Sequence, residues 1–168
     1  SPAGLALTRQ GVPTLERGHG EASADSMAHA RLTARGGYVL AEGSREPEVI
    51  LIATGSEVAL ALEARDTLER EDVATRVVSM PCVEWFDEQD AAYRAAVLPT
   101  AVRARVTVEA GVSQSWHRFL GDHGRWVSLE HFGASADAAT LHEKFGITAQ
   151  AVVEAAKASL DSVGKAPQ

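Results

Sequence analysis

Two hydrophobic patterns alternate along the chain from about residue 37. Short runs rich in Val, Ile and Leu predict strands, and apolar residues spaced three and four apart predict helices between them. We expect strands at 37–40, 49–53, 76–80, 103–109 and 126–129, and helices at 58–68, 87–97, 113–120, 136–145 and 149–160. This alternation predicts an α/β fold: a three-layer, Rossmann-like domain whose mostly parallel sheet of about five strands has helices on both faces.

The first 24 residues depart from this alternation. Residues 5–8 form a short apolar run, which predicts a strand with almost nothing in front of it, and residues 10–24 have the glycine, proline and serine content of a linker or surface loop. We therefore expect residues 1–24 to be the end of a preceding domain plus a linker, 25–163 to be the α/β domain, and 164–168 to be a frayed tail. A domain that simply begins with a strand is the alternative.

Composition narrows the class of protein. The 168 residues fit one domain, and 45% hydrophobic with 23% charged residues is typical of soluble globular chains. The net charge of −7 argues against nucleic acid as a partner. A single cysteine excludes an intrachain disulfide, and the sequence has neither a signal pattern nor the roughly 18 apolar residues of a membrane span. We expect a cytoplasmic protein without membrane contact.

The turn between strand 49–53 and the next helix is the first candidate site. Thr54, Gly55 and Ser56 stand where backbone N–H groups and the helix dipole hold anions in many α/β proteins. The turn has neither a dinucleotide fingerprint nor a P-loop lysine, so a weak anion site competes with a plain helix cap. The spacing of Thr54 and Glu57 fits a capping box.

Other reactive side chains each have two interpretations. Cys82 comes directly after the end of a predicted strand, and it is interpreted either as a nucleophile or as a small hydrophobic residue that is partly buried. Trp85 and Trp116 suit either ligand stacking or packing in a core or domain interface. Arg9 suits either phosphate binding or an ordinary surface position. The six histidines lack metal-ligand spacing, so we expect no metal site in this chain.

Several segments together resemble the C-terminal part of transketolases. They are LALTRQ (5–10), RGGYVL (35–40), VILIATGSEVALAL (49–62), RVVSMPCVEWFDEQDAAYRAAVLP (76–99), ARVTVEAG (104–111) and HFGASADAATLHEKFGIT (131–148). The resemblance implies a thiamine-diphosphate enzyme of the pentose phosphate pathway, which transfers a two-carbon ketol unit from a ketose phosphate to an aldose phosphate. It also implies three α/β domains, the middle one binding the cofactor's pyrimidine, and a homodimer with cofactor sites between subunits.

Carried over residue by residue, the resemblance assigns little to this chain. It implies that Arg9 binds the phosphate of the substrate, and it assigns no catalytic residue. The family holds thiamine diphosphate and Mg²⁺ through a GDG…N motif, whereas this chain has no GDG and no asparagine. We therefore expect an inactive fragment without cofactor or metal, which needs the N-terminal and middle domains and contributes Arg9 and an assembly surface.

Two departures and one alternative remain. Cys82 stands where the family usually has serine or alanine, and Asp137 stands where it has proline, so the local geometry at both positions is in question. The alternative function is a free-standing anion-binding or regulatory module that has the same fold, with its ligand at the 54–56 turn.

Overall fold

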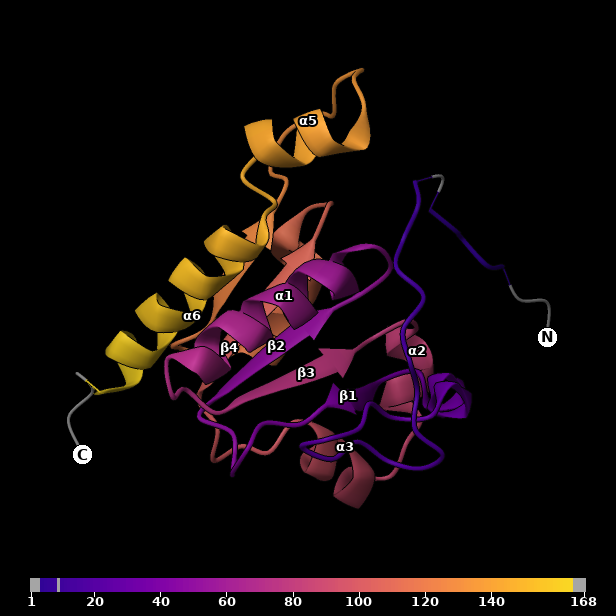
Figure 1. Ribbon diagram of the computed structural model, residues 1–168, viewed down its shortest axis with the longest axis vertical. Coiled ribbons are helices and arrows are strands. Elements are labelled where there is room, and N and C mark those ends of the chain that lie inside the picture. The colour runs from indigo at the N-terminus through magenta and orange to yellow at the C-terminus, as the bar shows by residue number, and fades with distance from the viewer. Residues whose placement is uncertain (1–3, 9, 165–168) are drawn as a thin grey trace.

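A twisted five-stranded sheet forms the centre of the computed structural model, which describes residues 4–8 and 10–164 (Figure 1). The strand order is β1-β3-β2-β4-β5. Strands β2 to β5 run parallel, and β1 pairs antiparallel with β3 at one edge. The α/β class and the mostly parallel sheet predicted from the sequence are confirmed. The strands are β1 (Tyr38–Ala41), β2 (Val49–Ala53), β3 (Thr75–Ser79), β4 (Ala104–Glu109) and β5 (Arg125–Ser128).

Helices cover both faces of the sheet, which confirms the three layers. The long helices α1 (Glu57–Arg70) and α6 (Ala149–Gly164) pack on one face. The other face is covered by α2 (Val83–Asp87), α3 (Ala91–Val97) and a 3₁₀ turn η2 (Ser113–Trp116) that leads into α4 (His117–Leu120). Two short elements complete the chain: η1 (Ala30–Arg35) before β1, and α5 (Ala138–Lys144), which stands beyond the end of α6 in Figure 1. Among the helices of the described residues, none has the length and apolar character needed to cross a membrane.

Strand β2 shows why an unbroken apolar run marks a central strand. All five of its residues are buried, and it lies between β3 and β4. Leu51 points into the core under α1 and α6, whereas Ile50 and Ile52 point into the core under α2, α3 and α4. Because side chains alternate between the faces, a strand covered on both sides needs an apolar residue at every position.

The strand predicted at residues 5–8 is wrong. These residues have no regular secondary structure and pair with no strand in the part of the chain described, and Leu5 and Leu7 are 84% and 77% exposed. An apolar run becomes a strand only where a sheet edge offers hydrogen-bond partners. The loop predicted at 10–24 is confirmed as irregular structure. It is fastened to the domain, because Gly18 donates its N–H to Met27 O at 2.8 Å and Arg17 donates to the Tyr38 hydroxyl at 3.0 Å. The division into domains at 24 and 25 stays a prediction.

The helix predicted from Asp87 is also wrong in its start. Asp87 ends the short helix α2, and α3 begins after Asp90. Asp90 has extended backbone, and its carboxylate accepts the Tyr93 N–H at 2.8 Å, which makes it the N-cap. Two aspartates three residues apart are both plausible caps by sequence. Tertiary packing selects Asp90, because α2 first buries Phe86 in the core and ends before α3 begins.

Candidate functional site

The parallel strands end at a groove, the position where open α/β sheets bind ligands. The connections after β2, β3 and β4 meet there, and they supply residues 54–57, 80–84 and 109–110. Segment 4–8 lines the groove as well. Its volume of about 1100 Å³ is enough for a sizeable ligand or for part of another protein.

The 54–56 turn carries β2 into α1 at the floor of this groove. Gly55 has a φ of +57°, a left-handed conformation that favours glycine. The predicted capping box is wrong, because α1 begins at Glu57 itself, so Glu57 is the first helical residue and not the third. Ser56 is the N-cap, but its side chain makes no capping bond and its hydroxyl lies 3.0 Å from Oε1 of Glu57.

Two carboxyl groups dominate the electrostatics of the groove. Glu57 is only 5% exposed at the start of α1, and Glu109 is half-buried at the end of β4. Burial, and second to it the negative charge of Glu57, raise the pKa of Glu109 to about 7. His142 of α5 lies with its Nε2 3.8 Å from Oε1 of Glu57. Near neutral pH Glu109 is therefore only partly ionised, and the groove floor carries less negative charge than two carboxyl groups of ordinary pKa would give it.

This charge bears on the candidate anion site at Thr54, Gly55 and Ser56. The Glu57 carboxylate occupies the first turn of the helix whose dipole would attract the anion, and so it competes with a bound ligand. The anion site stays a prediction, and we expect any binding there to be weak.

The aromatic and thiol side chains near the groove take different positions. Trp116 is 6% exposed and packs 6.1 Å from the Phe119 ring, which confirms its interpretation as a core residue. Trp85 is 46% exposed, so it does not belong to the core. Cys82 is half-buried at the N-cap of α2, with its thiol 3.5 Å from a carboxylate oxygen of Glu84. Among the described residues that line the groove there is no histidine to activate this thiol.

The groove does not fit thiamine diphosphate held by a metal ion. Its acidic floor repels a diphosphate, and within residues 4–8 and 10–164 no three His, Cys, Asp or Glu side chains are grouped to hold a metal. We therefore derive no chemical step through this cofactor. Arg9, the predicted phosphate ligand, lies outside the described residues.

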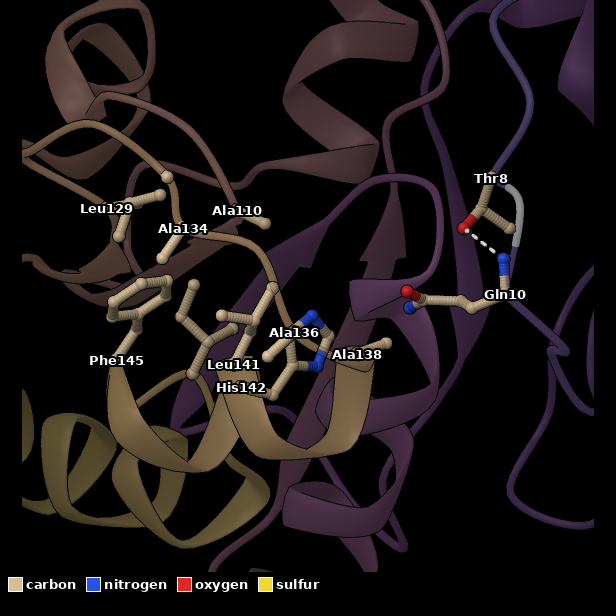
Figure 2. Close-up of a pocket in the computed structure, with 12 residues that line it drawn as sticks. Thr8, Gln10, Ala110, Leu129, Ala134, Ala136, Ala138, Leu141, His142 and Phe145 are labelled. Carbon is tan, nitrogen blue, oxygen red and sulfur yellow. Dashed lines mark hydrogen bonds between the residues drawn. The ribbon is translucent and has the colours of Figure 1, made fainter.

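A second cavity of about 470 Å³ lies between the N-terminal segment and α5 (Figure 2). Thr8 and Gln10 line one side, and the side chain of Gln10 points toward His142 on the other. The remaining lining is mostly apolar and includes Leu129, Leu141, Phe145 and Ile147. Sequence reasoning missed this cavity because its two sides lie about 130 positions apart, and no local pattern marks such a meeting.

Asp137 caps the start of α5, at the position where the resemblance predicts proline. Its carboxylate accepts the Thr140 N–H at 3.0 Å and lies 2.7 Å from the Thr140 hydroxyl. Its backbone is extended, as an N-cap requires. Aspartate therefore starts the helix by capping it, and the pKa of its carboxyl is lowered by these hydrogen bonds, with the Thr140 N–H first.

Known proteins resemble this chain in sequence and in structure. Residues 36–148 match the family model described as the transketolase-like TK C-terminal domain. The transketolase of Mycobacterium leprae is 53% identical over 165 residues, which is 96% of this chain and 22% of that protein. The chain thus spans about a fifth of the length of the curated relatives it matches.

Solved structures agree with the sequence likeness. A transketolase of Pichia stipitis, in complex with sedoheptulose-7-phosphate, aligns with a TM-score of 0.72 at 34% identity over 80% of this chain and 19% of that chain. A split gene transketolase, described as an inactive β4 tetramer, aligns with a TM-score of 0.63 at 28% identity over 91% of this chain and 48% of that chain.

Proposed function

This chain belongs to the transketolase family as its C-terminal domain, and from this premise we propose that it is the third domain of an enzyme that transfers a two-carbon ketol unit between ketose and aldose phosphates. The supporting observation is the family match over 36–148 together with 53% identity over nearly the whole chain. The alternative of a free-standing anion-binding or regulatory module has no support from these likenesses. It also has the acidic groove against it, because Glu57 and Glu109 disfavour an anion.

We place the chemistry in the rest of the enzyme. About four fifths of the relatives' length lies outside this chain, and the groove here does not fit a metal-bound diphosphate. Thiamine diphosphate and Mg²⁺ would then be bound by the N-terminal and middle domains. The split gene protein, of which this chain covers 48%, is inactive as a β4 tetramer, which supports an inactive C-terminal part. The homodimer, the pentose phosphate pathway and the cytoplasmic location remain proposals.

Within this function, Arg9 is proposed to bind the phosphate of the substrate. A guanidinium donates two parallel N–H bonds to phosphate oxygens, and it keeps its charge at every physiological pH. The sedoheptulose-7-phosphate complex of the Pichia stipitis enzyme supports sugar phosphates as the substrate class. A contact of this kind strengthens the binding of phosphorylated substrates and leaves the transferred ketol unit untouched.

Replacing Arg9 in the complete enzyme tests this proposal. For Arg9→Ala we expect the KM of phosphorylated substrates to rise roughly 10- to 150-fold, because a charge-assisted contact of about 1.5–3 kcal/mol is lost. The KM of the corresponding free sugars should not change. Steady-state kinetics with both substrate types measure this, and Arg31→Ala, at an exposed position, is the matched control.

Two outcomes would count against these proposals separately. Equal losses on phosphorylated and free sugars would remove Arg9 from the phosphate site and leave the family's reaction in place. Absence of ketol transfer in the unaltered complete enzyme would overturn the proposed function itself.

A further inference from the structure

Large apolar side chains stand exposed around the carboxyl end of the sheet. Phe132, four residues beyond the end of β5, is 99% exposed, and Leu5 and Leu7 are nearly as exposed on the segment that lines the groove. Thr8 connects the two regions, because it lines both the groove and the cavity beside Gly133. We call this surface, defined by Leu5, Leu7, Phe132 and the groove, the carboxyl-end face. Large apolar side chains that a folded protein leaves exposed around one end of a sheet mark an interaction surface.

The charges in the groove specify what can cover this face. Three carboxyl groups line it, those of Glu57, Glu84 and Glu109. The only cation among its described lining residues is Arg118, which is already paired with Asp87. A covering surface of matching chemistry is therefore apolar around Phe132 and brings an arginine or lysine to the groove floor.

The path of the polypeptide points to one such surface. In the relatives this chain corresponds to the C-terminal part, so about four fifths of the enzyme precedes it. That part must connect through segment 4–8, which lies along the groove and beside the cavity of Figure 2. The preceding part of the enzyme therefore joins this chain at the carboxyl-end face, and the covalent connection gives the two parts a high effective concentration for each other.

We propose that the carboxyl-end face is an interface and not an open ligand site, and that the preceding domain of the same polypeptide covers it with an apolar surface carrying a basic side chain. This inference rests on the proposed function. It gives Phe132 and the Glu57–Glu109 pair a role in joining the domains. It also accounts for a groove that has the usual position of a ligand site and the wrong charge for a phosphate.

A second copy of this chain fits the same face less well. A symmetric contact through this face would bring two acidic grooves toward each other, and like charges across an interface oppose association. The preceding domain has no such restriction, because its surface is not a copy of this one.

Photo-crosslinking in the complete enzyme tests the proposal. The substitution Phe132→p-benzoylphenylalanine keeps an aromatic ring at a position that makes no contribution to the core, so the fold should survive. After irradiation, we expect mass spectrometry to join residue 132 to peptides of the preceding domain. The control Glu46→p-benzoylphenylalanine, in the exposed loop between β1 and β2 at the opposite end of β2, should give no such crosslink.

The outcomes separate this inference from the proposed function. Crosslinks from residue 132 to a second C-terminal chain, or to no residue of the preceding domain, would overturn the interface. The same preparation is assayed for ketol transfer. An active enzyme without the crosslink would overturn the proposed interface alone. A crosslinked enzyme without ketol transfer would overturn the proposed function alone. As a charge test, Glu109→Arg should lower the melting temperature of the complete enzyme by several degrees more than Glu46→Arg. Equal shifts would contradict the basic partner.

Discussion

Glu109 shows how neighbours distant in sequence set the chemistry of one side chain. The strand predicted at 103–109 places it at a strand end, but nothing local reveals that Glu57, 52 positions away, lies beside it. The partners of two arginines are likewise not visible in the local sequence. Arg105 donates to four backbone carbonyls, and Arg76 pairs with Glu42 at 2.7 Å, so both support the fold and neither is free for a ligand. The residue types could be predicted as chemically interesting, but their partners could not.

The raised pKa of Glu109 predicts a pH-dependent stability. The folded chain holds the proton up to about pH 7, whereas the usual value for glutamate is 4.5. The stabilisation from the bound proton is therefore fully present below about pH 4.5 and is lost as the pH rises through 7. For Glu109→Gln we expect the free energy of unfolding to rise by about 1–2 kcal/mol at pH 8, after allowance for solvent screening, and to change little at pH 4.5.

Urea unfolding of the 168-residue chain at the two pH values measures this difference, with Glu46→Gln on the exposed β1–β2 loop as the control. A loss of stability in Glu109→Gln at pH 8, or the same change at both pH values, would contradict the account.

At the scale of elements, apolar periodicity located most helices and strands but not the polar groups that join them. Strand β2 begins and ends where its apolar run does, and α6 contains the whole helix predicted at 149–160. The starts of α1 and α3 were misplaced because several polar residues compete as caps and packing decides among them. Ser159 was missed for a similar reason, because the sequence pattern of an amphipathic helix does not show whether a serine in it is buried.

Ser159 fastens α6 to the sheet. It is fully buried, accepts the Arg105 N–H of β4 at 3.1 Å and donates to His123 O at 2.7 Å. For Ser159→Ala we expect a loss of about 1–3 kcal/mol in the free energy of unfolding, because buried backbone groups lose a partner. Ser162→Ala, at a half-exposed serine one turn later whose hydroxyl lies 3.0 Å from His123 Nδ1, should cost less. Chemical denaturation of both variants gives the comparison, and equal losses would refute the role assigned to Ser159.

At the scale of the whole molecule, the layered architecture could be predicted and the meetings between distant segments could not. Alternating strands and helices fix a sheet covered on both faces, because right-handed crossovers leave few other arrangements. They do not fix the antiparallel direction of β1, the course of segment 4–8 along the groove, or the cavity between Gln10 and His142. Those features depend on contacts that span most of the chain, and they define the carboxyl-end face.

The central claim is that this chain is one domain of a transketolase whose chemistry lies in the others. The direct measurement is ketol transfer from a ketose phosphate to an aldose phosphate, with thiamine diphosphate and Mg²⁺, by the complete enzyme and by the 168-residue chain at equal concentration. The account predicts steady turnover by the complete enzyme and no product above background from the chain alone. Turnover by the isolated chain, or its absence in the complete enzyme, would contradict the account.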